Sequence, residues 1–237
     1  PGAAGSAGNA AGNVSAAGST SESGAGGVAV VAGAAGTGAG VAGGGAGSGG
    51  GVAGGAAGLA GMGGIQPNPE GVPADYQLFI DQSFAEASSL SQLKFADPQD
   101  WMHQTTDGGF VEATGATYAP PHASPHSLAI FFEQKFGAFV LDAEVMQTNP
   151  SGGHRDFCVA WAMESPSRFY YAHIAEAHDA VAHNIHIVLD ADRTAITKTN
   201  TPGFAWGTNE WHQLRLTRSA TGDMAVYMDG SAMPILT

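Results

Sequence analysis

The sequence predicts an all-β fold, an antiparallel β-sandwich of the jelly-roll type, which follows a Gly/Ala-rich segment without fixed structure. Three observations lead to this prediction. The composition changes near residue 66, short segments with alternating apolar and polar residues follow, and Gly, Pro, Asn and Asp recur between those segments. A period of two is typical of strands with one buried face, and closely spaced turn residues separate antiparallel strands.

The chain divides into a low-complexity linker or tether, residues 1–66, and one globular domain, residues 67–237. Residues 1–64 hold 25 of the 36 glycines and 19 alanines, with no aromatic residue and one charged residue, Glu22. Such a stretch buries too little apolar surface to offset the entropy of ordering it. The remaining residues, about 170, suffice for one domain with a substantial core.

The charge and the apolar runs exclude two kinds of partner. The formal net charge is −13 at pH 7, whereas nucleic acids and anionic membranes require a positive surface. The apolar run at residues 28–31 of the Gly/Ala-rich segment is far shorter than the roughly 20 residues of a membrane-spanning helix. The net negative charge is compatible with neutral sugars, cationic ligands and divalent metals as partners. The alternative explanation is that it only keeps a surface protein soluble.

Candidate strands follow one another from residue 76 onward. They cover residues 76–80, 101–104, 110–113, 128–132, 139–146, 156–163, 168–174 and 184–190. Residues 83–93 are expected to hold one or two helical turns, capped by Ser83. Three prolines between residues 118 and 126 exclude that stretch from a central strand. Eight to ten antiparallel strands are typical of a sandwich or jelly roll.

The clearest hairpin joins residues 211–218 to residues 222–230. Leu214 and Leu216 alternate with polar residues in its first strand. The connection, residues 219–223, contains the Gly and Asp that a hairpin loop of about five residues needs.

From residue 128 to this Trp-His hairpin, the chain resembles bacterial domains of the concanavalin A-like lectin/glucanase superfamily, closest to its LamG-like and 3-keto-disaccharide-hydrolase-like members. Besides the hairpin, the matching strings are FGAFVL (136–141), GHRD (153–156), PSRFYY (166–171) and HNIHIV (183–188). The resemblance implies a jelly-roll sandwich that recognises polysaccharide on its concave sheet. It also implies that one or two final strands are missing, which would leave an open sheet edge.

A Gly/Ala-rich stalk before a sandwich domain resembles the tether of bacterial surface lipoproteins. The resemblance implies an extracellular or cell-surface protein, lipid-anchored through a segment outside this sequence. The chain begins at Pro1 without a methionine, so we expect a targeting segment to have preceded it.

Sugar binding needs flat aromatic rings and rigid polar groups, and both are concentrated between residues 152 and 193. The candidate ligand-binding residues are His154, Arg155, Asp156, Tyr171, His173, Asn184 and Arg193. The alternative is that Tyr171 is a core aromatic residue and that the histidines only cover a polar sheet face.

A glycoside hydrolase or polysaccharide lyase of the same superfamily is an alternative to a pure binding protein, and a protein–protein adhesion module is a third. Sandwich glucanases carry two carboxylates about 5 Å apart, on a Glu-x-Asp-x-x-Glu strand. This chain has no such string, and its candidate catalytic residues are Asp156, Glu176 and His173, as an acid/base set. Whether the protein is an enzyme stays open.

The sequence assigns no metal or cofactor. His178, Asp179, His183 and His186 offer zinc ligands, but their spacing matches no metal-binding motif. A structural calcium ion is the other candidate, because sandwiches of the resembled superfamily often carry one. Cys158 is the only cysteine, so no intramolecular disulfide forms, and we expect it to pack as a small hydrophobe.

Overall fold

A computed structural model describes most of the chain beyond residue 76. The described residues are 9–18, 27–31, 72–73, 76–115, 117–131, 137–148 and 155–237, with backbone only for 9–18, 27–31 and 77–79. Extended strands dominate them, and helix is confined to two 3-10 turns, η1 (Ala87–Gln92) and η2 (Pro98–Asp100). The predicted all-β character is confirmed, and the expected helical turns near residue 83 are limited to η1, which the Ser83 side chain does not cap.

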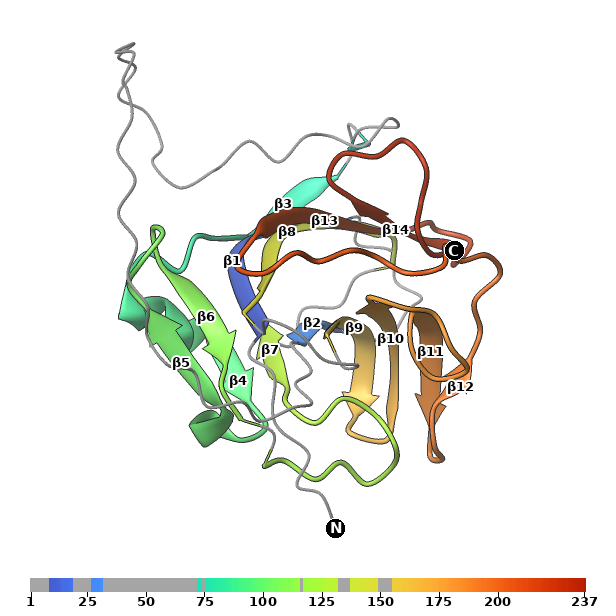
Figure 1. Cartoon of the computed structure of the whole chain (residues 1–237), viewed down its shortest axis with the longest axis horizontal. Helices are drawn as coiled ribbons and strands as arrows, with labels where there is room; N and C mark the ends of the chain where they lie inside the picture. Colours follow the sequence, from blue (N-terminus) through green and yellow to red (C-terminus); the bar gives the residue numbers. More distant parts are fainter. Residues whose placement is uncertain are drawn as a thin grey trace.

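The strands form two antiparallel sheets of seven strands each within the described residues (Figure 1). The first sheet has the order β14-β13-β8-β1-β6-β5, and β3 also pairs with β1. Its strands are β14 (Met224–Met228), β13 (Trp211–Arg218), β8 (Phe139–Gln147), β1 (Asn9–Gly18), β6 (Phe110–Ala113), β5 (Trp101–Gln104) and β3 (Gln77–Gln82).

The second sheet has the order β12-β11-β10-β9-β2-β7-β4, and β8, β13 and β14 of the first sheet arch over part of it in Figure 1. Its strands are β12 (Thr194–Ala195), β11 (Asn184–Leu189), β10 (Arg168–Ala175), β9 (Asp156–Ser165), β2 (Gly27–Val31), β7 (Ala129–Phe131) and β4 (Leu93–Phe95). The short strands β4 and β12 lie outside the segments that the sequence pattern predicts.

Two strands come from the segment that we expected to be a flexible tether. β1 lies between β8 on one side and β6 and β3 on the other, and β2 lies between β9 and β7. The structure therefore differs from the expected tether at these two strands, and the other residues of 1–66 lie outside the described ones. Backbone N–H and C=O groups alone make the ladder, so a segment of Gly and Ala can pair without any side-chain pattern.

The inward-facing side chains of both sheets form one hydrophobic core. Leu141 of β8 and Leu214 of β13 belong to the same buried cluster as Phe157 of β9 and Ile174 of β10. All four side chains are at most 1% exposed. The alternating pattern in the sequence thus marks the residues that the two sheets bury between them.

The predicted C-terminal hairpin is present as β13 and β14, paired antiparallel. His212 links its two ends, because Nδ1 lies 2.9 Å from the Asp229 carboxylate and Nε2 lies 2.7 Å from the Trp206 carbonyl oxygen. Asp229 also accepts a hydrogen bond of 3.0 Å from the Gln213 backbone N–H. The Trp-His and Asp-Gly residues that suggested the hairpin therefore hold its open end together.

The outer edge of β14 is paired at its middle residue, Val226. The Val226 N–H donates to the Leu236 carbonyl at 2.9 Å, and the Ile235 N–H donates to the Val226 carbonyl at 2.8 Å. Leu236 is fully buried in the core. An open sheet edge was expected after this hairpin, and residues 235–236 pair with the middle residue of β14, Val226, instead.

A buried ion pair lies on the outward face of the first sheet. Asp142 of β8 and Arg215 of β13 are directly opposite each other, and each is 6% exposed. The guanidinium donates two hydrogen bonds to the carboxylate, through Nε and Nη2. Burial raises the pKa of Asp142, although the hydrogen bond and charge of Arg215 oppose the rise.

Asp142→Ala is expected to lower the free energy of unfolding by about 3–5 kcal/mol, because it leaves the Arg215 charge buried without a partner. The double variant Asp142→Leu/Arg215→Met should recover most of this loss. Urea denaturation measures both. Lys198→Ala, which breaks an exposed ion pair with Asp223, is the control and should cost about 0–1 kcal/mol. A similar cost for Asp142→Ala would show that the pair is not buried.

Candidate functional site

The outward face of the second sheet gathers most of the predicted ligand-binding residues. Tyr171 of β10 is directly opposite His186 of β11, and His173 is opposite both Asn184 of β11 and Cys158 of β9. Directly opposed residues of antiparallel strands share a face of the sheet. Their side chains therefore lie on one side, away from the main core.

We call the polar and aromatic group on this face the outer-face cluster. Its members are Asp156, Cys158, Tyr171, His173, His186 and Arg193. The Tyr171 and His186 rings are stacked with centroids 4.9 Å apart, and the His173 ring lies 6.1 Å from that of His186. Arg193 precedes β12 and acts electrostatically on Cys158, Tyr171 and His186.

His173 is held between two acceptors. Its Nε2 lies 3.0 Å from the Asp156 carboxylate, and its Nδ1 lies 2.9 Å from the Val181 carbonyl oxygen. A carbonyl oxygen only accepts, so Nδ1 donates to Val181, and the contact with the Asp156 carboxylate fixes the ring from its other side.

A loop that we call the strap, residues 117–128, covers the outer-face cluster. Tyr118 and Leu128 pack against the apolar cluster that contains Cys158 and Tyr171. The middle of the strap is fastened to the turn before β12, because the Asp192 carboxylate accepts the Ala123 N–H at 2.9 Å and the Ala123 carbonyl accepts the N–H of residue 193 at 3.2 Å. As a result, the side chains beneath the strap are almost fully buried.

The burial is nearly complete for the central members of the cluster. Tyr171 is 0% exposed, His186 is 1% exposed and Cys158 is 3% exposed. A polysaccharide on the surface of the protein would therefore not reach them while the strap is in place.

Asp100 anchors both ends of the strap. Its carboxylate accepts hydrogen bonds from the backbone N–H (2.9 Å) and hydroxyl (2.8 Å) of Thr117, the Tyr118 N–H (3.3 Å) and the Ser127 hydroxyl (3.2 Å). Burial opposes ionisation, but the hydrogen bonds outweigh it and lower the pKa of Asp100. A Cβ at Gly115 would lie 2.5 Å from the Asp100 carboxylate, so this position requires glycine.

The remaining predicted ligand-binding residues have other partners. The Asn184 amide donates to the carbonyl oxygens of Asp179 and Ala182, both at 2.9 Å, and so holds the turn before β11. Arg155 lies 3.4 Å from the Glu176 carboxylate. His154 lies outside the described residues.

The predicted acid/base set is brought together only in part. Asp156 and His173 form a pair, whereas Glu176 faces Arg155. Sequence reasoning gave His186 only as a possible zinc ligand and missed its stacking on Tyr171. The register between β10 and β11, which the sequence does not show, makes that contact.

Two of the four predicted zinc ligands, His183 and Asp179, are occupied by other contacts. His183 accepts the Ala175 N–H at 3.3 Å through Nδ1 and contacts the Thr201 hydroxyl at 3.0 Å through Nε2. Asp179 accepts the backbone N–H groups of residues 181 and 182, each at 2.7 Å. Among the described residues, no group of three or more His, Cys, Asp or Glu side chains is placed to hold a metal ion.

Cys158 packs as the small hydrophobe that we expected. Burial raises the pKa of its thiol well above the ordinary value, the negative charge of Asp156 adds to the rise, and Arg193 opposes it. Since the thiolate is the nucleophile, a thiol held protonated in this way is unreactive.

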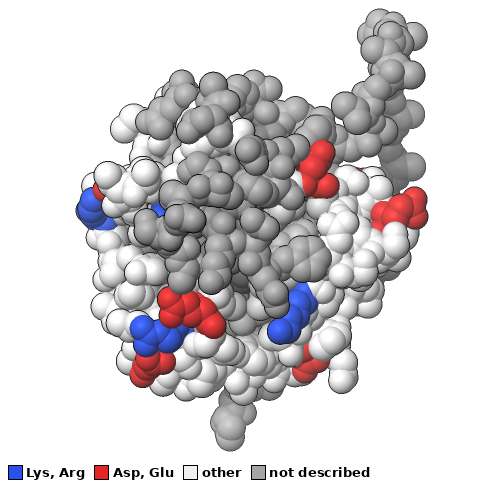
Figure 2. Space-filling model, turned by 180° about the vertical axis from the view of Figure 1, so that it is seen from behind, with Lys and Arg blue, Asp and Glu red and all other residues white. Residues whose placement is uncertain are grey.

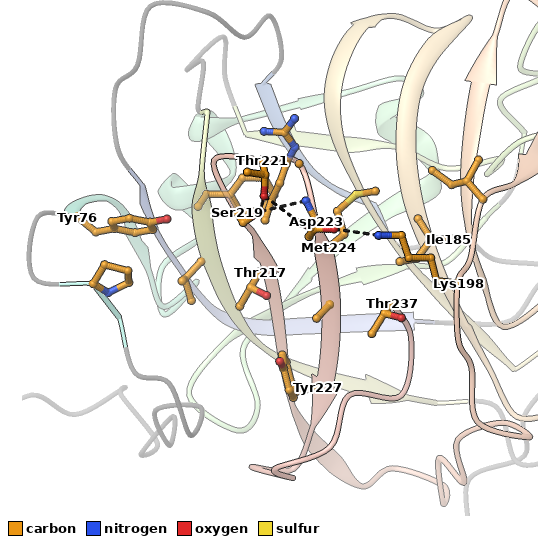
Figure 3. Close-up of a pocket in the computed structure, with 17 residues that line it drawn as sticks. Tyr76, Ile185, Lys198, Thr217, Ser219, Thr221, Asp223, Met224, Tyr227 and Thr237 are labelled. Carbon is orange, nitrogen blue, oxygen red and sulfur yellow. Dashed lines mark hydrogen bonds and ion pairs between the residues drawn. The ribbon is translucent and has the colours of Figure 1, made fainter.

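A groove of about 620 Å³ lies elsewhere, along the β13–β14 hairpin (Figure 3). Thr217 and Tyr227 of the hairpin line it, with Tyr76 on one side and Lys198 on the other. Hydroxyl groups of Ser219, Thr221 and Thr237 add to its lining. Lys198 forms an ion pair of 2.9 Å with Asp223. Sequence reasoning missed this groove because its residues come from distant parts of the chain.

Comparisons with known proteins do not identify this chain, since no family model, curated protein or solved structure matches it significantly. Within the described part of the chain, no helix combines the length and apolar character needed to cross a membrane. Among the described residues on the face shown in Figure 2, some acidic groups lie beside basic ones and others stand alone.

The unfolding free energy should fall as the pH is lowered below about 6.5. Burial, with the charges of His173 and Arg193, lowers the pKa of His186 to about 3. The unfolded chain, with an ordinary histidine pKa of about 6.5, then binds a proton that the folded chain excludes. The stability that His186 contributes is full above pH 6.5 and is lost progressively toward pH 3.

His186→Gln should remove about 2 kcal/mol of the difference in unfolding free energy between pH 6.5 and pH 4.5. Urea denaturation at the two pH values measures it, with His126→Gln on the exposed surface of the strap as the control. His183, whose pKa burial lowers to about 4, acts in the same direction and remains in the variant. An unchanged pH dependence in His186→Gln would contradict the burial of this ring.

Proposed function

We propose that the protein is a carbohydrate-binding β-sandwich of the jelly-roll, concanavalin A-like type, and that it binds polysaccharide in the groove along the β13–β14 hairpin. The observation that carries the proposal is the lining of this groove. Two tyrosines, several hydroxyl groups and the Lys198–Asp223 ion pair face one open space.

The groove has the chemistry that sugar recognition needs. Tyrosine rings pack against the apolar faces of pyranose units, and hydroxyl and charged groups hydrogen-bond to sugar hydroxyls. The volume of about 620 Å³ falls within the range of ligand pockets, roughly 300–1,000 Å³. The floor is a paired β-hairpin, which holds Thr217 and Tyr227 in fixed positions.

The proposal places the sugar on a different surface from the one that the sequence predicted. The predicted residues Tyr171 and His173 lie beneath the strap, so a polymer could contact them only after the strap moved. The groove on the first sheet needs no such movement.

Binding is better supported than catalysis. A glycoside hydrolase needs two carboxylates at its site, and Asp223 is the only acidic residue among the groove-lining residues that the structure describes. Asp223 is also engaged by Lys198. The Asp156–His173 pair, the other acid/base candidate, is buried under the strap.

An extracellular or cell-surface location belongs to the same proposal, because that is where polysaccharides are found. The acidic net charge of −13 agrees with an uncharged polymer as partner better than with nucleic acid. A protein–protein adhesion module has no observation of its own in its favour.

Tyr76→Ala should weaken binding to a neutral polysaccharide about tenfold, because loss of a stacking ring costs on the order of 1 kcal/mol beyond the lost contact area. A panel of immobilised neutral polysaccharides identifies the ligand, and titration calorimetry measures the affinity. Tyr171→Phe, beneath the strap, is the matched control and should bind like the wild type. The proposal fails if no polysaccharide binds, or if Tyr171→Phe loses binding while Tyr76→Ala keeps it.

A further inference from the structure

We infer that Arg193, Tyr171 and His186 of the outer-face cluster form a binding site for a carboxylate, separate from the groove. None of these three residues lines the groove, so the site stands or falls independently of the proposed function. Unpartnered buried polar atoms, the charge of the cluster and its donor pattern lead to this inference.

Both ring nitrogens of His186 are buried without a hydrogen-bond partner of ordinary geometry within the described structure. The buried Tyr171 hydroxyl has only the Arg193 side chain to interact with. The His186 and Tyr171 side chains are 1% and 0% exposed. Buried polar groups are almost always hydrogen-bonded, because an unpaired group loses its interaction with water and gains nothing. Such a set of unpaired groups on one sheet face indicates a missing partner.

The charge of the cluster indicates an anion. Arg193 lies close enough to act on Tyr171, His186 and Cys158, and it forms no ion pair with a described carboxylate. Burial keeps the Cys158 thiol protonated by raising its pKa and keeps His186 uncharged by lowering its pKa. A monoanion would supply the partner that Arg193 lacks among the described carboxylates.

The donor pattern fits a carboxylate. A neutral His186 offers one N–H, Tyr171 offers one O–H, and the guanidinium of Arg193 offers a planar fork. A carboxylate has two oxygens with about four acceptor positions and binds arginine in a two-pronged manner. A cation would be repelled by Arg193, and a neutral sugar hydroxyl would leave its charge unpaired.

Access to this site lies at the edge of the strap. Arg193 is partly exposed, whereas Tyr171 and His186 are covered. The backbone of residue 193 is hydrogen-bonded to Ala123 of the strap. A carboxylate would therefore enter between the strap and the turn before β12, with the arginine at the entrance and the two rings inside.

Histidine-labelled full-length protein, titrated with sodium acetate, sodium glucuronate or glucose and followed by NMR, tests the inference. Acetate and glucuronate should shift the ring signals of His186 saturably, and glucose should not. Arg193→Gln should weaken binding at least tenfold. Arg168→Gln is the matched control, because that arginine is exposed and already paired with Glu164 and Asp190, and it should bind like the wild type.

The two carboxylates separate the sources of the ligand. Equal affinity would assign the site to small organic acids, and a clear preference for glucuronate would assign it to acidic sugars. No saturable shift of His186 with either anion, or an equal shift in Arg193→Gln, would overturn the inference. Binding of neutral polysaccharide to Arg193→Gln should stay unchanged, so failure here is distinguishable from failure of the groove.

Discussion

The alternation of side chains along β9, β10 and β11 decides what each face of the second sheet does. Phe157, Ile174 and Ile185 point toward the first sheet and join the common core. The residues that alternate with these along the strands, such as Cys158, Tyr171 and His186, point away from the first sheet and belong to the outer-face cluster. A shift of one residue in the register would exchange the two sets and place histidines in the core. The core, the stacked rings and the strap that covers them all depend on this register.

The strap turns a polar sheet face into an interior. Asp100 gathers hydrogen bonds from both ends of the strap, and Asp192 holds its middle. The aromatic and imidazole rings beneath it are then shielded from water, which lowers the pKa of His186 and raises that of Cys158. We propose two places where a ligand enters, namely the Arg193 edge of the strap for a small anion and the groove over β13 and β14 for an uncharged polymer.

The sequence predicts the strands well where a face is buried, because burial imposes the period of two. The hairpin of β13 and β14 and the shared face of Tyr171 and His173 are examples. The cover over that face could not be foreseen, since the contact between Asp192 and Ala123 joins residues 69 positions apart. β1 and β2 escaped prediction for a different reason: they lie in a stretch dominated by Gly and Ala, which can pair through the backbone without a long alternating pattern. The groove likewise joins Tyr76 to Tyr227 across most of the domain.

Labelling of the single thiol with a maleimide tests the closure of the outer-face cluster most directly. Cys158 is the only cysteine and lies beneath the strap. The native protein should react only as fast as it opens or unfolds, and Asp100→Asn, which loosens the strap ends, should react much faster under conditions in which both proteins remain folded. Immediate reaction of the native wild-type thiol would show that the strap does not close the outer-face cluster. The argument that a polymer is kept from this face and binds in the groove instead would then be wrong.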